Sequence, residues 1–396
     1  MADADKPIAG RGQPAPDVLV VGGGVMGLWA ALKAGRAGHR VLLVDRDRVG
    51  AGASGGLLGA LMPHLPDRWN AKKQFQFEAL VRLEDEAHAL ESDTGLSTGY
   101  RRCGRLIPLG KPHLADQARR QAADAIDTWA TPGGRFRFDL LGSPDACGSA
   151  EWPAADAMEH GLVRETLAAR ISPRGLLAAL AAALQALPNL EVAEGLGLAA
   201  LDPAKGVAIF DDGRTVPFGT CVLSAGVESF PLIQSLDPEL RHPVGTGVKG
   251  QAALFRADIP DDLPILYSDG IYAVPHEGGL VAVGSTSEMA FDAPLTTDDR
   301  LDTVIERACR MAPVLRKATL VERWAGVRPK AIGRDPMAGL HPDFPRLAIL
   351  TGGFKISFGV AHALADVVVA QMTNGSPSGL PSSFDPATHL EAARRI

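Results

Sequence analysis

The chain has 396 residues, which is long enough for two or three domains. Hydrophobic residues make up 46% of it and charged residues 22%, a globular composition that excludes a chain disordered throughout. The net charge of −6 gives no electrostatic reason to bind nucleic acid or an anionic membrane, and no apolar run is long enough to predict a membrane span. A small molecule is therefore the expected partner.

The spacing of cysteines and histidines predicts no metal site. The ten histidines form no HxxxH or HExxH pattern, and the cysteines lie far apart without a CxxC pair. The cysteines are Cys103, Cys147, Cys221 and Cys309. Because this spacing suggests no disulfide framework either, a reduced cytoplasmic location is expected.

The first structured segment, residues 17–45, reads as a strand, a tight turn, a helix and a second strand. In the turn, Gly22 permits the sharp bend, Gly24 lets a pyrophosphate approach the backbone, and Gly27 lets the helix pack closely on the strand. Asp45 ends the second strand, where a carboxylate accepts hydrogen bonds from ribose hydroxyls. The pattern predicts a dinucleotide site, and the neighbouring residues assigned to it are Val25, Met26 and Arg46.

A second glycine-rich loop occupies residues 46–60, where an NAD-type domain normally continues into another crossover helix. Its exposed amides suit a large cofactor. The loop resembles the flavin-contacting loop of the FAD-dependent amino-acid oxidase superfamily, which includes glycine oxidase, D-amino acid oxidase and sarcosine oxidase. The resemblance implies contacts with FAD from Ser54, Gly55, Gly56 and Leu57.

The rest of the chain alternates between helical and strand-like patterns. Hydrophobic residues at helical spacing predict helices at 71–93, 113–130, 173–187, 298–311 and 360–372. Apolar runs and alternating patterns predict strands at 104–109, 221–226, 248–255, 266–274, 280–285, 320–324 and 347–350, and a β-meander at 190–201 and 205–210. Glu277-Gly-Gly279 is typical of a hairpin turn, and the Gly- and Pro-rich residues 131–161 are expected to form loops and short strands.

The order of these elements resembles glycine oxidase over roughly residues 17–375. The best local matches are Ser172-Pro-Arg174, Val222–Gly226, Tyr272–Pro275, Val281–Thr286 and Trp324–Pro329. The resemblance implies an α/β fold with a discontinuous, Rossmann-like FAD-binding domain of the glutathione-reductase type and an α+β substrate domain built on an antiparallel sheet. The expected FAD-binding segments are 17–70, 161–241 and 320–380, and the substrate segments are 71–160 and 242–319. A disordered tail is expected at 1–16 and a C-terminal tail at 381–396.

The same resemblance implies further contacts with FAD. Leu198 matches a position whose backbone contacts adenine, and the strand that ends in Ala225 and Gly226 is expected to approach the cofactor closely. A later turn matches one that faces the flavin, and its residues are Gly353, Phe354, Ile356 and Ser357. No cysteine lies near the position that carries covalent flavin in sarcosine oxidase, so non-covalent FAD is expected.

Arg328 is the first candidate for substrate binding. It lies in an otherwise apolar segment, where an unpaired guanidinium is costly to bury and a carboxylate is its best partner. The matching arginine of glycine oxidase and D-amino acid oxidase holds the substrate carboxylate. The alternative is a structural ion pair with an acidic side chain of the protein.

Two further residues are assigned to catalysis by resemblance. Lys355 lies in a stretch, residues 353–360, that is similar to the segment of sarcosine oxidase whose lysine binds a carboxylate close to the flavin. Tyr272 falls on the position of glycine oxidase whose hydroxyl reaches the substrate. The alternatives are a surface lysine and a core tyrosine. His64, after the second glycine-rich loop, is either close to the flavin or a local cap.

These features predict an FAD-dependent oxidase or dehydrogenase that oxidises the C–N bond of a small amino acid or N-methyl amino acid. Hydride transfer to flavin N5 would give an imine, and oxygen or another acceptor would take up the electrons. A homo-oligomer is compatible with this prediction. Two alternatives stay open: a flavin domain that oxidises a modified tRNA wobble uridine, to which residues 59–63 are similar, and a flavin-binding subunit without turnover of its own. The net charge argues against the first.

Overall fold

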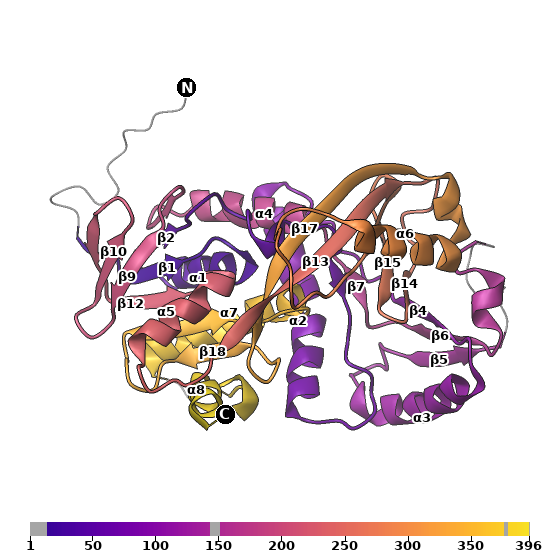
Figure 1. Cartoon of the computed structure of the whole chain (residues 1–396). Helices are drawn as coiled ribbons and strands as arrows, with labels where there is room; N and C mark the ends of the chain where they lie inside the picture. The colour runs from indigo at the N-terminus through magenta and orange to yellow at the C-terminus, as the bar shows by residue number, and fades with distance from the viewer. Residues whose placement is uncertain (1–13, 143–150, 376–378, 396) are drawn as a thin grey trace.

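The computed structural model describes residues 14–142, 151–375 and 379–395, so Cys147 lies outside the described residues. Figure 1 shows two halves side by side, one built on a mainly parallel sheet between layers of other elements and one built on a larger sheet on which further helices pack. None of the helices in the described part of the chain combines the length and the hydrophobicity that crossing a membrane requires.

The first half contains a six-stranded sheet. Its order is β18 (Met337–Leu340), β19 (Leu347–Thr351), β12 (Thr220–Leu223), β1 (Val18–Val21), β2 (Val41–Val44) and β8 (Leu190–Ala193). All neighbours are parallel except β18 and β19, which are antiparallel. The central strand β1 is buried on both faces, as the run Val-Leu-Val-Val predicts for a parallel strand. The strands that carry the glycine-rich turn and Asp45 therefore lie at the centre of a rigid sheet.

Helices and a small sheet cover the two faces of this sheet. One face packs on α1 (Val25–Arg36), α4 (Pro173–Gln185) and α7 (Ser357–Asn374), which share a large apolar core. The other packs on the antiparallel sheet of β9 (Leu198–Asp202), β10 (Val207–Phe210) and β11 (Thr215–Pro217) and on α5 (Ser229–Leu236). Helix α4 begins where the Ser172 hydroxyl accepts from Gly175 N–H at 3.1 Å, with a proline in its first turn.

The second half contains an eight-stranded sheet. Its order is β17 (Thr319–Ala331), β13 (Gly245–Arg256), β16 (Leu280–Gly284), β15 (Ile271–His276), β14 (Ile265–Ser268), β4 (Arg105–Pro108), β6 (Leu162–Glu165) and β5 (Phe138–Leu141). Only the β4–β14 pair is parallel. Side chains alternate between the faces, so that Ala253 and Val283 pack on helix α6 (Asp299–Met311), whereas Ala252 and Tyr272 lie on the opposite face with Leu57.

The remaining helices connect the halves and close the ends. Helix α2 (Ala71–Thr94) packs on α4 and α7, and α3 (Pro112–Thr128) packs on β5. The short β3 (Ala60–Leu61) and β7 (Ala169–Arg170) pair with each other. Strands β13 and β17 pair along almost their whole length and cross from one half of the molecule to the other (Figure 1).

The predicted α/β class with two domains is confirmed, but several sequence expectations were wrong in detail. Residues 190–201 do not start a meander, because β8 joins the six-stranded sheet beside β2. The single strand expected over 266–274 is the hairpin of β14 and β15, which turns at Asp269 and Gly270. Within the expected C-terminal tail, α8 (Pro386–Arg395) buries Leu390 and Ala393 against the core.

The proposed domain boundaries differ from sheet membership at three places. Strand β17 belongs to the eight-stranded sheet although it lies almost entirely within the segment 320–380, and β6 belongs to the same sheet although it lies within 161–241. Helix α2 lies in the segment 71–160 but contributes Leu80 and Leu83 to the core of the first half. A hydrophobic pattern reports that a segment is buried, not which sheet buries it.

Candidate functional site

A cavity of about 940 Å³ lies between the two halves of the molecule and contains most of the residues that the sequence assigned to a site. The assigned residues that line it are Gly22, Gly24, Val25, Met26, Asp45, Arg46, Ser54, Gly56, Leu57, Leu198, Ala225, Gly226, Tyr272, Arg328, Phe354, Lys355, Ile356 and Ser357. The volume falls within the range of 300–1,000 Å³ that is usual for ligand and cofactor sites, at its upper end. One continuous space thus joins the dinucleotide motif to the candidate catalytic residues.

The glycine-rich turn is built by close backbone packing. Gly22 has φ +107°, and a Cβ there would lie 2.4 Å from the carbonyl oxygen of Ser224. A Cβ on Gly27 would lie 1.9 Å from the carbonyl oxygen of Gly22. Gly27 therefore does not line the cavity, and its role is to let α1 pack against the turn, as the sequence pattern predicts.

The N-terminus of α1 faces the cavity. The first bond along the helix is from Leu28 N–H to the Gly24 carbonyl at 2.9 Å, which leaves the preceding amides without helical partners. One of them, Val25 N–H, donates to Ser54 Oγ at 3.0 Å and so ties the second glycine-rich loop to the first. The helix end and its dipole favour an anionic group such as a pyrophosphate at this place.

Asp45 is held in a fixed orientation at the end of β2. Its Oδ2 accepts from Gly23 N–H at 2.7 Å, and its Oδ1 accepts from Asp47 N–H at 2.8 Å. Each carboxylate oxygen retains a further lone pair that can accept from a ligand hydroxyl in the cavity. Arg46 is exposed, and its Nη1 lies 3.8 Å from Glu228 Oε1, a pair that contributes little to stability.

Two glycines leave open space in the wall of the cavity. No atom lies within 4 Å of where a Cβ would be on Gly52 or on Gly226, and both residues line the cavity. Beyond them, Leu198 lies with Leu196, Pro231 and Leu232 around an apolar end of the cavity, of which only Leu198 was assigned from the sequence. The apolar lining, the helix N-terminus and the carboxylate at the end of β2 fit the adenine, pyrophosphate and ribose of FAD.

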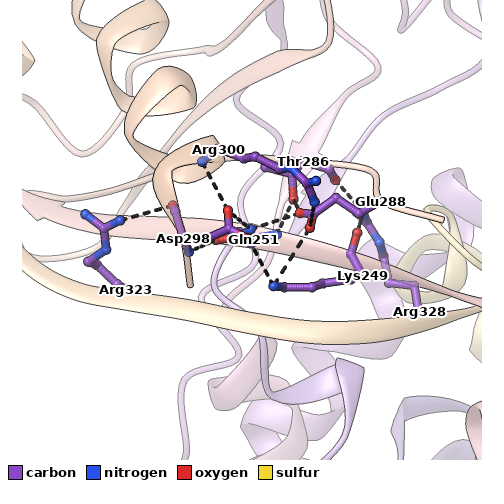
Figure 2. A network of polar contacts seen from close by, with 8 residues as sticks. All are labelled: Lys249, Gln251, Thr286, Glu288, Asp298, Arg300, Arg323 and Arg328. Atoms are coloured by element: carbon purple, nitrogen blue, oxygen red, sulfur yellow. Dashed lines mark hydrogen bonds and ion pairs between the residues drawn. The ribbon is translucent and has the colours of Figure 1, made fainter. Parts of the chain in front are cut away.

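Arg328 lies on β17 in the wall at the other end of the cavity. Its Nη2 donates to the Thr286 carbonyl at 2.6 Å, and its Nη1 donates to Ser285 Oγ at 3.2 Å (Figure 2 shows Arg328 beside Thr286). A Cβ on Gly250 would lie 2.4 Å from Nη2, so only glycine leaves room for the guanidinium there. No ion pair to Arg328 occurs among residues 14–142, 151–375 and 379–395, and its buried Nε has no hydrogen-bond partner there.

The structural ion pair that was the alternative role for Arg328 is therefore not found among the described side chains. Burial lowers the pKa of Arg328 from its usual value, but a guanidinium keeps its charge in proteins. A half-buried cation that is held only by neutral acceptors favours an anion from outside the chain.

The cationic groups of Lys355 and Arg328 both lie over the ring of Phe354. The Arg328 Cζ lies 5.4 Å and the Lys355 Nζ 5.6 Å from the centroid of Phe354. Phe354 itself has φ +46°, a strained conformation for a residue other than glycine. Lys355 lines the cavity, and its pKa is lowered by partial desolvation of the ammonium there and by the nearby charge of Arg328.

Tyr272 completes this end of the cavity. Its ring packs against Tyr267 with centroids 4.8 Å apart, and both tyrosines line the cavity. Burial raises the pKa of Tyr272 to about 12, so its hydroxyl is a neutral hydrogen-bond donor at physiological pH. The structure thus brings all three residues that were assigned to catalysis to one end of one cavity.

Some assignments are not reproduced in the cavity lining, and other lining residues were missed. Gly55 and Gly353 do not line the cavity: a Cβ on Gly55 would lie 2.4 Å from the Gly50 carbonyl oxygen, and one on Gly353 would lie 2.3 Å from the Met26 side chain. These glycines allow close packing behind the wall. Residues that line the cavity but were not assigned from the sequence include Arg105, Gln251, Tyr267, Ser285 and Trp324.

His64 lines the cavity. Its backbone N–H donates to Gln76 Oε1 at 2.8 Å, and its Nε2 is buried without a partner among the described residues. Burial lowers the pKa of His64 to about 4, with help from the nearby charges of Lys72 and Lys73. His64 is therefore neutral at physiological pH.

Comparison with known proteins agrees with the fold and with the order of the motifs. The chain is 29% identical over 383 residues to glycine oxidase from Pseudomonas putida, covering 94% of this chain and 99% of that protein. The structure matches glycine oxidase from Geobacillus kaustophilus with a TM-score of 0.81 at 21% identity, covering 93% and 98% of the two chains. It matches iminodiacetate oxidase from Chelativorans sp. BNC1 with a TM-score of 0.80 at 22% identity and the same coverage.

A family comparison covers most of the chain. The family described as FAD dependent oxidoreductase, DAO, matches residues 17–367. The match begins at the first strand of the dinucleotide motif and ends within α7. FAD agrees with the apolar lining around Leu198, the N-terminus of α1 and the Asp45 carboxylate described above. The chain therefore belongs to the DAO family of FAD-dependent oxidoreductases and is an FAD-dependent amino acid oxidase in type.

Proposed function

We propose that the protein oxidises the C–N bond of a small amino acid or N-methyl amino acid, with FAD bound non-covalently. The observation that carries this proposal is the Arg328 guanidinium, which lies in the cavity wall without an ion-pair partner among the described residues. A carboxylate is the anion that matches its planar fork of donors. The substrate is therefore expected to carry a carboxylate next to the C–N bond that is oxidised.

Lys355 and Tyr272 would assist Arg328 in holding the substrate. Lys355 adds a second positive charge on the Phe354 ring, which favours the same carboxylate. The Tyr272 hydroxyl, neutral because its pKa is about 12, can donate a hydrogen bond to a carboxylate oxygen. Binding by three groups would fix the orientation of the substrate α-carbon within the cavity.

FAD, when bound, would supply the acceptor for the two electrons and the hydrogen of the α C–H bond, and oxygen or another acceptor would then take up the electrons. The nitrogen lone pair of the neutral amine forms the C=N bond as the C–H bond breaks. Water then hydrolyses the imine to a carbonyl compound and the free amine or ammonia. The contribution of the chain is to bind, orient and surround the substrate rather than to form a covalent bond with it.

The positions of the cysteines support non-covalent FAD. Cys103, Cys221 and Cys309 are the cysteines in the described part of the chain, and none of the three lines the cavity. Cys221 is buried in β12, and burial raises its thiol pKa far above the ordinary value. A buried, protonated thiol is a poor nucleophile.

An anaerobic panel of amino acids and simple amines tests the proposal. The purified holoprotein is mixed with each compound in turn, and flavin absorbance is recorded without oxygen. We expect at least one small amino acid or N-methyl amino acid to bleach the flavin, and the amine that lacks the carboxylate to do so much more slowly. Absence of bleaching by every amino acid would contradict the proposal and favour a flavin-binding subunit without turnover of its own.

A further inference from the structure

A buried polar network lies beside Arg328 (Figure 2), and one of its members, Gln251, also lines the cavity. It joins strand β13, the segment that follows β16 and the N-terminus of helix α6. We call it the Glu288 network; its members are Lys249, Gln251, Thr286, Glu288, Asp298 and Arg300. Neither the hydrophobic pattern nor the family motifs assigned any of these residues to the site.

Thr286 connects this network to Arg328 through its two oxygen atoms. Its backbone carbonyl accepts from Arg328 Nη2 at 2.6 Å, the shortest contact of that guanidinium. Its hydroxyl accepts from Gln251 N–H at 2.9 Å and donates to Glu288 Oε1 at 2.5 Å. The hydroxyl therefore fixes the position of the residue whose carbonyl orients Arg328.

Glu288 is the centre of the network. Its side chain is buried and accepts from Gln251 Nε2 at 2.9 Å and from Arg300 Nη1 at 2.7 Å, in addition to the Thr286 hydroxyl. Its backbone pairs with that of Lys249 in both directions at 3.0 Å. The segment that holds Arg328 is thus attached to β13 by main-chain and side-chain bonds together.

Gln251 links the same site to α6. The side chain is fully buried, and its Oε1 accepts from Asp298 N–H at 2.8 Å while its Nε2 donates to Asp298 Oδ1 at 2.7 Å. Asp298 also caps α6 by accepting from Arg300 N–H. Every polar group of Gln251 is therefore satisfied, as a rigid buried network requires.

The charges of the network balance without Arg328. Its two cations, Lys249 and Arg300, face its two carboxylates, Glu288 and Asp298, with Lys249 Nζ 3.4 Å from Asp298 Oδ2. Arg328 receives only carbonyl and hydroxyl oxygens from the chain. The network therefore fixes the geometry of the guanidinium but leaves its charge for a ligand.

We propose that Thr286 is a positioning residue for the substrate carboxylate and that it acts through Arg328. The inference rests on the proposed function, because it assumes that Arg328 binds that carboxylate. Loss of the hydroxyl would leave Gln251 N–H and one oxygen of Glu288 without this partner inside the protein. The segment 285–287 would then be free to shift, and a bidentate contact at Arg328 depends on small displacements.

Three variants of Thr286 test the proposal in the holoenzyme. In Thr286→Val the hydroxyl is replaced by a methyl group of similar size, Thr286→Ala removes the hydroxyl without adding a group, and Thr286→Ser keeps the hydroxyl. Benzoate serves as a probe that carries a carboxylate, and its binding is measured by the change in flavin absorbance. In the Val and Ala variants we expect the Kd of benzoate and the KM of the best amino acid to rise about tenfold, while kcat changes much less. The Ser variant should restore wild-type values.

The matched control is Asp302→Asn. Asp302 lies on the same helix α6 and pairs with Arg323 at 2.6 Å, but it has no contact with Thr286 or Glu288 among the described residues. The control should retain the wild-type Kd and KM, and FAD content and Tm are measured for every variant. If only one of the Val and Ala variants folds, that variant decides the test.

The outcomes separate the two proposals. If amino acids reduce the wild-type flavin but the hydroxyl-deleted variant retains the wild-type Kd and KM, the role of Thr286 is refuted and the proposed function stands. Equal loss in the Ser and Val variants would also refute it, because the hydroxyl would not be the cause. If no amino acid reduces the wild-type flavin, the proposed function fails and this inference fails with it.

Discussion

Replacement of Arg328 by alanine should reduce kcat/KM for amino acids by two to three and a half orders of magnitude. The guanidinium is half-buried, is held by Thr286 and Ser285, and has no carboxylate partner among the described residues, so the substrate would be its counter-ion. Removal of one member of a buried ion pair costs about 3–5 kcal/mol, and each 1.36 kcal/mol corresponds to roughly a factor of ten in rate. Initial rates of oxidation with oxygen, or with an artificial dye if oxygen reacts slowly, give the value.

Two variants on the same strand control for this measurement. Arg328→Lys should also be strongly impaired, because an ammonium cannot reproduce the bidentate fork. Arg323→Ala removes an arginine of β17 that pairs with Asp302 and does not line the cavity, so it should keep nearly full activity. Near wild-type efficiency of Arg328→Ala would refute the carboxylate assignment, as would a wild-type enzyme that prefers amines without a carboxylate.

Four further predictions follow from the same site and its surroundings. Acid or heat should precipitate the protein and release intact FAD into the supernatant; flavin that stays with the pellet would indicate a covalent link. Asp45→Ala should weaken FAD binding by about ten- to a hundredfold in a titration of the apoprotein, since the carboxylate is expected to bind ribose; an unchanged Kd would refute that role. The affinity for benzoate should fall as the pH rises toward the pKa of Lys355, which lies below its usual 10.5 because of burial and Arg328, and Lys355→Met should remove this dependence. Burial and the charge of Arg170 lower the pKa of His276 to about 4. The contribution of neutral His276 to the free energy of unfolding should therefore be fully present above pH 6.5 and fall by about 3 kcal/mol as the pH is lowered toward 4; His276→Gln should flatten this part of a Tm–pH profile.

The nucleotide-binding part of the fold was predictable because its signals are local. Gly22, Gly27 and Asp45 act within one strand–turn–helix–strand unit, so their spacing carries the geometry. The sheet membership of β8 and β17 was not predictable in this way. Both are apolar segments whose partners lie far away in the sequence, and the pattern of a strand does not name its neighbour.

The residues of the candidate site also fall into two groups, those that local sequence motifs reveal and those that only the structure reveals. Arg328, Lys355 and Tyr272 come from three distant segments and were found because each stands in a motif that resembles the family. Thr286 and Gln251 were missed as site residues, since a threonine and a glutamine on strand-like segments read as ordinary polar residues. Only their hydrogen bonds, to Glu288 and to each other, reveal their connection to Arg328.

The long ladder of β13 and β17 restricts how the molecule can open. The two strands form a continuous antiparallel ladder. It starts beside the six-stranded sheet, where Ile332 N–H donates to the Val244 carbonyl, and ends on the far side of the second half. A hinge motion that separated the two halves would have to bend these strands or break their hydrogen bonds. Residues 62–65, 67 and 68 also line the cavity, and hydrogen bonds from Lys73 and Gln76 attach this loop to α2. Arg328 on β17 therefore stays at a nearly constant distance from the turn before α7, to which Lys330 is joined by a bridge at Gly353.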